Sequence, residues 1–357
     1  MCKFLLVGGG KIGEMIAEML SSTGDYDITV ADRCANALKK FEHLKNVTGI
    51  QIDVSDEEAL RRTIAGHQAV LSALPYDVTK PLAKAAADEG VNYFDLTEDV
   101  AGTRYVRQLA DDSDSAVMPQ CGLAPGFISI VAHDLANEFD EIHDVRMRVG
   151  ALPQFPSNAL KYNLTWSTEG VINEYCNPCE AIRDGEQREI MPLEGKESFA
   201  LDGVDYEAFN TSGGLGTLCE TLAGKVRNLD YKSVRYPGHC DIAKLLVRDL
   251  GLSRRQDLLK EILDEALPHT LQDVVIIFVT VSGMKGGKLC QESFAKKIYA
   301  KELYGKERGA IQITTAASAC AVIDLMQDGK LPNQGFVKQE QVRLDDFLSN
   351  RFGQHYA

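Results

Sequence analysis

The sequence lacks several features that would place it in a special class of protein. Its 357 residues include one tryptophan, and 38 lysines and arginines stand against 52 aspartates and glutamates. The formal net charge of -14 disfavours partners such as nucleic acids or anionic membranes, because both require a positive protein surface. No apolar run has the length needed to cross a bilayer, and the best candidate, residues 274–281, has the length of a strand.

Signals for export and for metal binding are also missing. The N-terminus has no basic segment followed by a cleavable apolar one, so we expect a cytoplasmic location. The nine cysteines are odd in number and scattered, which predicts reduced thiols. Cys176 and Cys179 form a C-x-x-C pair without a second pair at zinc spacing, so we expect a structural role for them and no bound metal.

The chain opens with an apolar strand, a glycine-rich turn and the start of a helix. Residues 8–13 read G-x-G-x-x-G directly after the apolar residues 4–7. In this pattern Gly8 makes the tight turn, Gly10 lets the backbone approach a pyrophosphate, and Gly13 allows the helix to pack closely on the strand. The positive end of the helix then favours a diphosphate, which predicts a dinucleotide site.

A second strand supports this prediction and bears on the choice of cofactor. Residues 27–31 end at Asp32, whose carboxylate would hydrogen-bond the adenosine ribose and favour NAD. Arg33 keeps NADP possible, because a guanidinium pairs with a 2′-phosphate. The residues predicted to contact the cofactor are Gly8, Gly10, Lys11, Ile12, Gly13, Asp32, Arg33, Asp53, Val54, Leu74 and Pro75.

Strands and helices alternate through the first third of the chain, which predicts an α/β Rossmann domain with a doubly wound parallel sheet. Expected strands cover 4–7, 27–31, 47–54, 69–74, 92–97 and 116–118, and expected helices cover 55–64, with a serine cap, and 79–90. We place this domain at residues 1–122.

The pattern of the sequence changes near residue 140, where polar and apolar residues begin to alternate. Expected strands at 143–150, 162–166 and 274–281, with helices at 242–250 and 258–266, predict an α+β substrate or dimerisation domain with a mostly antiparallel sheet at residues 123–305. We read the glycine-rich stretch 283–287 as a hairpin turn. We expect a buried helix over 312–326 within a segment, 306–357, that returns to the first domain, and a homodimer as the common default.

Several ordered motifs resemble the saccharopine dehydrogenase-like reductase family over almost the whole chain. They are Gly122-Leu-Ala-Pro-Gly126, Leu152-Pro-Gln154, Trp166-Ser-Thr-Glu-Gly170, Asn210-Thr-Ser-Gly-Gly-Leu-Gly-Thr217, Arg235-Tyr-Pro-Gly-His239 and Gly335-Phe-Val337. The resemblance implies hydride transfer between an amine and an imine with a nicotinamide cofactor. Ala124 stands where saccharopine reductases have an aspartate, so the chain looks most similar to lysine 6-dehydrogenases.

The resemblance and the chemistry together suggest roles for a few side chains. Oxidation of an amine needs a base, and His239 is the leading candidate by its intrinsic pKa. Arg235 could grip the α-carboxylate of an amino-acid substrate with two hydrogen bonds. The predicted catalytic residues are His239, Tyr76 and Asp95, and the predicted substrate-binding residues are Arg235, Tyr236, Glu98, Ala124 and Trp166.

Two alternatives to a lysine 6-dehydrogenase remain open at this point. The first is a saccharopine or carboxynorspermidine dehydrogenase, which acts on a larger secondary amine. The second belongs to another class: a dinucleotide-binding sensor that keeps the fold without catalysis.

Overall fold

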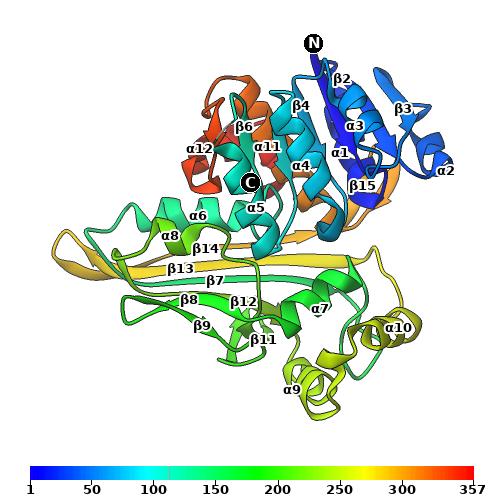
Figure 1. Ribbon diagram of the computed structural model, residues 1–357. Helices are drawn as coiled ribbons and strands as arrows, with labels where there is room; N and C mark the ends of the chain where they lie inside the picture. Colours follow the sequence, from blue (N-terminus) through cyan, green and yellow to red (C-terminus); the bar gives the residue numbers. More distant parts are fainter. Residues whose placement is uncertain (112) are drawn as a thin grey trace. The chain divides into compact units, whose positions relative to one another are not determined.

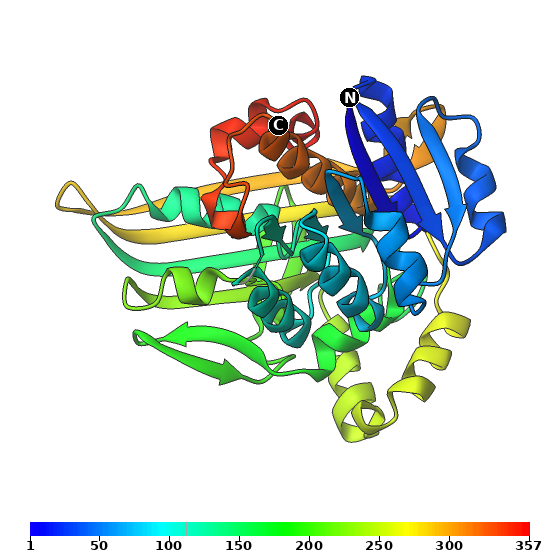
Figure 2. The ribbon, with the colours of Figure 1, turned by 45° about the horizontal axis from the view of Figure 1, so that its top comes forward.

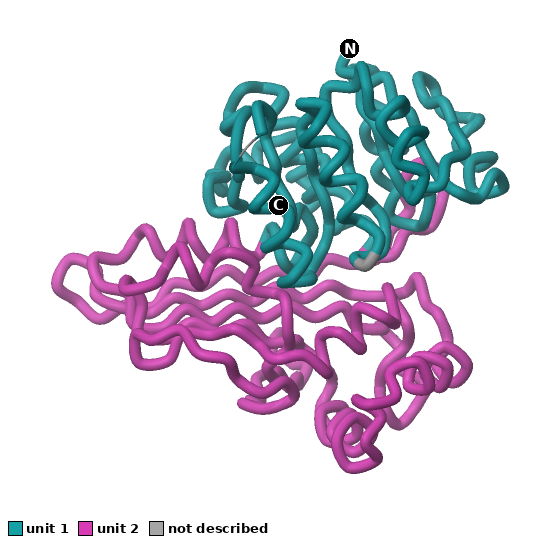
Figure 3. Tube along the Cα trace, in the orientation of Figure 1, with its two compact units in different colours: residues 1–127, 312–357 teal, residues 128–311 magenta. Residues whose placement is uncertain are grey.

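The computed structural model describes residues 1–111 and 113–357 and divides into two compact units (Figure 3). Unit 1 comprises Met1–Phe127 and Gln312–Ala357, and unit 2 comprises Ile128–Ile311. The chain therefore leaves unit 1 five residues later than the predicted end at residue 122. The difference has a physical reason, because the ring of Phe127 packs on Tyr356 of the same unit at a centroid distance of 3.9 Å.

Unit 1 contains a parallel seven-stranded sheet with the order β17-β6-β5-β4-β1-β2-β3, drawn mostly in blue and cyan in Figure 1. This is the predicted Rossmann arrangement, in which the strand order reverses beside β1. The strands are β1 (Cys2–Val7), β2 (Tyr26–Asp32), β3 (Val47–Gln51), β4 (Ala69–Ser72), β5 (Asn92–Asp95), β6 (Ala116–Met118) and β17 (Gly335–Phe336).

Helices cover both faces of this sheet. They are α1 (Lys11–Thr23), α2 (Ala35–Leu38), η1 (Lys39–Phe41), α3 (Glu57–Ile64), η2 (Tyr76–Val78), α4 (Lys80–Asp88), α5 (Val100–Ala110), α11 (Ala310–Gln327), η5 (Gln339–Gln341), α12 (Leu344–Ser349) and η6 (Gly353–Tyr356). Leu5 and Val7 pack with residues of α3, α4 and α5, whereas Tyr26, on the opposite face, bonds Asp324 of α11. The alternation of side chains along each strand thus produces two buried faces.

The C-terminal segment completes unit 1. Strand β17 pairs in parallel with β6 and adds a seventh strand to the six expected from the sequence. Arg351 binds both carboxylate oxygens of Asp324, with Nε 3.0 Å from Oδ2 and a second nitrogen 2.6 Å from Oδ1. This two-pronged ion pair holds the tail against α11.

Helix α11 is the expected buried helix and the most apolar long helix of the described residues. Its 18 residues pass a length and composition test for a membrane span, with a mean hydropathy of 1.2. In the structure 83% of that segment is buried, and its alanines at 316, 317, 319 and 321 are inaccessible to solvent. Burial in a protein core accounts for its composition.

Unit 2 contains a large mixed sheet with the order β10-β11-β12-β7-β13-β14, to which β8 and β9 add through β12 (Figure 2). All pairings are antiparallel except β12 with β7, so the sheet is mostly antiparallel as predicted. The strands are β7 (Glu141–Pro153), β8 (Cys179–Arg183), β9 (Glu186–Ile190), β10 (Glu197–Leu201), β11 (Val204–Asn210), β12 (Val226–Arg235), β13 (Asp273–Lys285) and β14 (Lys288–Tyr299). A separate small hairpin joins β15 (Lys301–Leu303) and β16 (Lys306–Arg308).

The helical part of unit 2 surrounds a second core. The elements of unit 2 are α6 (Phe127–Ala136), α7 (Thr168–Cys176), α8 (Leu218–Thr221), α9 (His239–Lys244), a π-helical turn η3 (Leu245–Asp249), η4 (Leu252–Arg254) and α10 (Gln256–Ala266). Apolar residues of α7, α9 and α10 form one buried cluster with the loop that precedes α7. This loop and the start of α9 carry several of the predicted site residues.

A few local expectations need correction. Helix α3 is capped by Asp56, which accepts from the amide of Ala59 at 3.0 Å, and not by Ser55, whose hydroxyl bonds Asp53 instead. Residues 162–166 form a loop rather than a strand, with a single bridge from Leu164 to His269. The stretch 283–287 forms the predicted hairpin: residues 283–285 end β13, and Gly286 and Gly287 make the turn into β14.

Candidate functional site

The glycine turn after β1 has the geometry that the sequence pattern requires. Gly8 has a φ of +110°, and a Cβ there would lie 2.6 Å from the carbonyl oxygen of Ala73. A Cβ on Gly13 would lie 1.9 Å from the carbonyl oxygen of Gly8, so α1 can approach β1 only if this residue is glycine. Both positions therefore exclude larger side chains for structural reasons.

Gly10 differs from these two glycines because a Cβ there would meet no atom within 4 Å. It is the N-cap of α1, and no side chain caps this helix end. The first amide groups of the helix, beginning at Lys11 and Ile12, have no partner within the helix and lie at the positive end of the helix dipole. Open space beside Gly10 and helix N–H groups without helical partners would suit the diphosphate of a dinucleotide, and contact of these residues with a cofactor stays a prediction.

Asp32 ends β2 beside the same turn. One carboxylate oxygen accepts a hydrogen bond from the amide of Gly9 at 2.7 Å, and the other accepts from the amide of Cys34 at 2.8 Å. The carboxylate therefore fixes the glycine turn to the segment that follows β2. Its contact with the ribose stays a prediction, and the structure adds a positioning role that the sequence pattern did not suggest.

The other predicted cofactor residues follow the carboxyl ends of the strands. Arg33 is exposed, and its charge contributes to lowering the pKa of Asp53, whose main cause is the hydrogen bonds from Ser55. Val54 and Leu74 pack against the buried cluster of unit 1, and Pro75 is exposed. Because ligands of such sheets bind outside the carboxyl ends of the strands, all of them lie at the edge where the cofactor is expected.

Asp95, at the end of β5, is completely buried. One of its oxygens accepts from the amides of Gln120 at 2.8 Å and Thr97 at 3.1 Å, and the other accepts from the hydroxyl of Tyr93 at 3.1 Å. Burial raises the pKa of this carboxyl to about 6, while these hydrogen bonds oppose the shift. The contacts favour a role in holding the loop after β6.

That loop carries Ala124. Gly122 and Gly126 form a bridge across it, and a Cβ on Gly126, whose φ is +133°, would lie 2.0 Å from the carbonyl oxygen of Gly122. The peptide between Ala124 and Pro125 is cis. The motif thus folds into a tight turn at the carboxyl edge of the sheet, with an apolar methyl at position 124.

Glu98 and Tyr76 complete the predicted residues of unit 1. Glu98 is partly buried, and burial raises the pKa of its carboxyl to about 7, with smaller contributions from the neighbouring charges of Asp99 and Asp95. Tyr76 begins η2, four residues after the end of β4, and is partly exposed. A carboxyl that titrates near neutral pH is suited to proton transfer.

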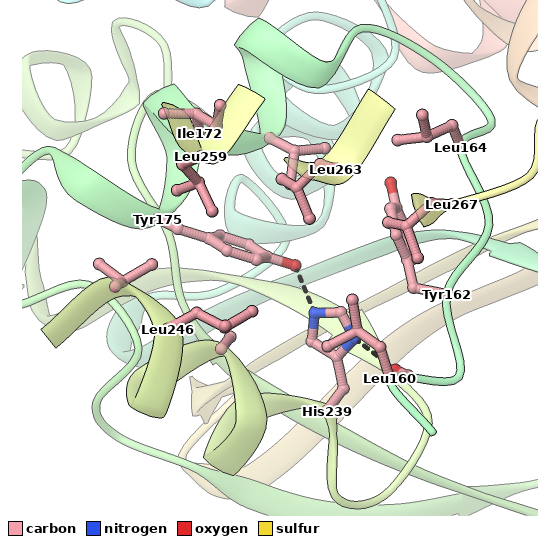
Figure 4. A pocket seen from close by; sticks show the side chains of 13 residues that line it. Leu160, Tyr162, Leu164, Ile172, Tyr175, His239, Leu246, Leu259, Leu263 and Leu267 are labelled. Carbon is pink, nitrogen blue, oxygen red and sulfur yellow. Dashed lines mark hydrogen bonds between the residues drawn. The ribbon is translucent and has the colours of Figure 1, made fainter. Parts of the chain in front are cut away.

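Two predicted residues of unit 2, Arg235 and His239, belong to a chain of buried hydrogen bonds, and Figure 4 shows the part of it that joins Tyr175, His239 and Leu160. The Nε of Arg235 donates to the hydroxyl of Tyr175 at 2.9 Å, and this hydroxyl lies 2.9 Å from Nε2 of His239. Nδ1 of His239 lies 2.8 Å from the carbonyl oxygen of Leu160. A carbonyl only accepts, so Nδ1 carries the proton and Nε2 accepts from the Tyr175 hydroxyl.

This arrangement fixes the state of His239. The residue is 1% exposed, and burial, together with the charge of Arg235, lowers the pKa of its imidazole to about 3. A neutral ring with both nitrogens engaged is a poor proton acceptor near pH 7. We therefore propose a positioning role for His239 in place of the predicted role as general base.

Arg235 is similarly engaged. It is 3% exposed and donates from one terminal nitrogen to the carbonyl oxygen of Val234 at 2.9 Å. The other terminal nitrogen lies 3.5 Å from a carboxylate oxygen of Glu174, and the guanidinium lies over the ring of Tyr162 at 5.0 Å. A grip on a substrate carboxylate would require these contacts to be exchanged, so the contacts favour a structural role for this side chain as well.

The segment from Arg235 to His239 holds the loop between β7 and α7. The hydroxyl of Tyr236 donates to the carbonyl oxygen of Pro153 at 2.9 Å, and Nζ of Lys161 donates to that of Pro237 at 2.9 Å. Trp166, at the end of this loop, donates from Nε1 to the hydroxyl of Tyr162 at 3.2 Å. Three motifs that are distant in the sequence are thus joined in one assembly within unit 2.

A small cavity lies inside this assembly (Figure 4). Its volume is about 30 Å³, and its lining is mainly leucine and valine side chains together with Tyr162, Tyr175 and His239. The exposed lining atoms are apolar, and the volume is comparable to that of one or two water molecules. Such a cavity is too small for an amino-acid substrate.

Two residues of this network, Glu174 and Tyr175, were not expected from the sequence. Tyr175 lies 60 positions from Arg235 and 64 from His239, so sequence proximity gives no signal. Among residues 1–111 and 113–357, no three His, Cys, Asp or Glu side chains are grouped so as to hold a metal ion.

The parallel sheet, its glycine turn and the open N-terminus of α1 define a dinucleotide-binding domain followed by a second α+β unit. Comparison with protein families gives the finer assignment. Residues 4–118 match the saccharopine dehydrogenase NADP binding domain, and residues 122–352 match the saccharopine dehydrogenase C-terminal domain. The chain belongs to the saccharopine dehydrogenase family.

Curated relatives are distant in sequence and longer. A saccharopine dehydrogenase (NADP+, L-glutamate-forming) of Pyricularia oryzae is 25% identical over 278 residues, which cover 74% of this chain and 60% of that protein. The mitochondrial alpha-aminoadipic semialdehyde synthase of Bos taurus is 24% identical over 312 residues, covering 83% of this chain and 33% of that protein. The chain therefore spans less than two thirds of either relative.

Solved structures confirm the fold. An apo saccharopine dehydrogenase (L-Glu forming) from Saccharomyces cerevisiae aligns with a TM-score of 0.81 at 17% identity, covering 97% of this chain and 96% of that one. A homospermidine synthase from Legionella pneumophila in complex with NAD aligns with a TM-score of 0.67 at 14% identity, covering 99% and 89%.

Proposed function

We propose that the chain is an NAD(P)-dependent oxidoreductase that transfers hydride at a carbon–nitrogen bond of an amino acid. The observation that carries the proposal is the turn at Gly8, Gly10 and Gly13, where two glycines are required by packing and the third leaves the N-terminus of α1 open. Membership of the saccharopine dehydrogenase family supports the choice of a C–N bond. The nicotinamide, when bound, supplies the hydride chemistry.

The side chains of unit 1 would then bind and orient the reactants and move the proton. Hydride leaves an amine only when the nitrogen is unprotonated, so the amine must first lose a proton to a base. Glu98 is the best candidate in this unit, because burial raises the pKa of its carboxyl to about 7. Asp95 would hold the loop after β6 in place through its bonds to the amides of Gln120 and Thr97.

The substrate that we favour is the ε-amine of lysine or a close analogue. The tight turn after β6 presents Ala124, an uncharged residue, where saccharopine reductases have an aspartate. Saccharopine is the specific alternative, because several curated relatives are saccharopine dehydrogenases. Carboxynorspermidine, like saccharopine a secondary amine, is a further alternative that the same chemistry would accommodate.

A substrate panel tests these proposals directly. The purified protein is incubated with lysine, saccharopine, other amino acids and polyamines, each with NAD+ or NADP+, and reduced nicotinamide is followed by absorbance. We expect turnover with lysine and formation of a cyclising aldehyde. Turnover with saccharopine alone would replace lysine as the substrate, and no reduction of either cofactor across the panel would contradict the enzyme proposal.

The proposed base has its own test. In Glu98→Gln the amide cannot accept the proton, so we expect kcat to fall by about 100-fold and the acidic limb of the pH profile near pH 7 to disappear. Glu58→Gln, which alters an exposed carboxylate in α3, is the matched control and should leave the profile unchanged. An unaltered acidic limb in Glu98→Gln would exclude Glu98 as the base.

We also propose a cytoplasmic homodimer. All nine cysteines are free thiols in the structure, which supports a reducing compartment. Two-fold assemblies are the commonest among oligomeric enzymes, which supports a dimer as the starting hypothesis for sedimentation measurements.

A further inference from the structure

One lysine of the segment that follows β2 lies beside the glycine turn. Lys40, in η1, places its Nζ 3.4 Å from the carbonyl oxygen of Gly10 and 3.4 Å from a carboxylate oxygen of Glu14 in α1. Its side chain is 30% exposed, whereas the preceding Lys39 is exposed. Lys40 therefore brings a positive charge to the N-cap of α1.

Asp32 and Lys40 contact consecutive residues of the same turn. Asp32 accepts from the amide of Gly9, and Lys40 lies beside the carbonyl oxygen of Gly10. In this class of fold the group at the adenosine 2′ position is read by residues at and shortly after the end of the second strand. Arg33 directly follows the end of the second strand, and Lys40 contacts the glycine turn, so these two residues are the candidate cations for that group.

The carboxylate of Asp32 is already engaged. Each of its oxygens accepts a backbone N–H, from Gly9 and from Cys34, and these bonds disperse its charge. Its first role is then to hold the turn. A group that selects between the two cofactors must be able to exchange its present partner for the cofactor. The Lys40 ammonium meets this requirement, because it is paired with Glu14 at a partly exposed site.

We propose that Lys40 selects NADP over NAD by exchanging its contact with Glu14 for the 2′-phosphate, with Arg33 as a second cation. The inference rests on the cofactor binding in the proposed function and names a residue for it. A 2′-phosphate carries between one and two negative charges and accepts charge-assisted hydrogen bonds from an ammonium. A 2′-hydroxyl offers no such charge, so Lys40 contributes little to NAD binding.

Binding measurements test the proposal without turnover. NADPH and NADH are titrated into the full chain, with nucleotide fluorescence or calorimetry as the readout, for the wild type, Lys40→Ala, Lys40→Arg and the matched control Lys39→Ala. Adenosine 2′,5′-bisphosphate and 5′-AMP serve as minimal probes for the two adenosine ends. Both lysines lie on the surface of unit 1, and circular dichroism checks that each variant is folded.

We expect the wild type to bind NADPH more tightly than NADH. Lys40→Ala should weaken NADPH and adenosine 2′,5′-bisphosphate by about 10-fold or more while NADH and 5′-AMP change less than about 2-fold. Lys40→Arg should retain the preference, and Lys39→Ala should behave as the wild type.

Three results would overturn the inference: tighter binding of NADH by the wild type, no effect of Lys40→Ala, or equal weakening of both cofactors, which would show that Lys40 only shapes the turn. A wild-type chain that binds neither nucleotide would instead refute the proposed function itself. The two failures are therefore distinguishable in the same titration.

Discussion

Removal of one hydroxyl group tests the buried network of unit 2. In Tyr175→Phe the ring stays and only the oxygen that joins Arg235 to His239 is lost. The Nε–H of Arg235 and the Nε2 of His239 then lack partners, at residues that are 3% and 1% exposed. Both groups then keep the desolvation cost of burial without the hydrogen bond that offset it.

The magnitude follows from the two orphaned groups. An unpaired buried polar group costs about 1–3 kcal/mol, and a group that carries charge costs more. We therefore expect Tyr175→Phe to lower the free energy of unfolding by about 3–5 kcal/mol, a large part of the roughly 5–15 kcal/mol that is typical of whole domains. Tyr236→Phe, which removes one hydrogen bond to the Pro153 carbonyl, is the matched control and should cost about 1 kcal/mol.

Fluorescence of Trp166 provides a local assay. It is the only tryptophan, and it donates to the hydroxyl of Tyr162 within the same loop, so its emission reports on unit 2 during urea unfolding. We expect the midpoint for Tyr175→Phe to fall by more than about 1 M urea. A loss no greater than that of Tyr236→Phe would refute the network as described, because it would mean that Arg235 and His239 find other partners.

Two further predictions concern pH and the glycine turn. The pKa of His239 falls from 6.5 in the unfolded chain to about 3 in the folded one, so between these pH values the unfolded state binds more protons and stability decreases as the pH falls. In urea titrations at several pH values, His239→Gln should remove this contribution to the slope of stability against pH, about 1.4 kcal/mol per pH unit. An unchanged slope would contradict the assignment. Gly13→Ala should destabilise unit 1 in thermal melts, because its Cβ would lie 1.9 Å from a backbone oxygen. Gly10→Ala should melt like the wild type yet bind NADH and NADPH more weakly. Equal behaviour of the two variants would contradict the separate roles of these glycines.

Local sequence patterns were sufficient for most of unit 1. The strands and helices expected from periodicity recur near their predicted positions, because each depends on residues that are close together in the chain. The helix expected over 55–64 begins two residues later, since Asp56 rather than Ser55 supplies the capping oxygen. The strand β17 was not expected, because its two residues pair with β6 more than 200 positions away and carry no period of their own.

The elements of unit 2 were less predictable from the sequence, because more of them depend on contacts between distant segments. The stretch 162–166 has the alternation of a strand, yet its side chains serve the Arg235 and His239 assembly instead of a sheet. Here contacts between distant segments decided the conformation.

The sequence by itself determined the glycine turn, the parallel sheet around it and the resemblance to a family, since a few glycines and the period of the strands suffice for these. Tertiary structure alone decided the state of the candidate side chains. The pKa and the hydrogen-bond capacity of a group depend on its burial and on neighbours such as Leu160, which lies 79 positions before His239. For the same reason, only the folded chain shows Lys40 beside Gly10, 30 positions away, where it can serve as a selector of the cofactor.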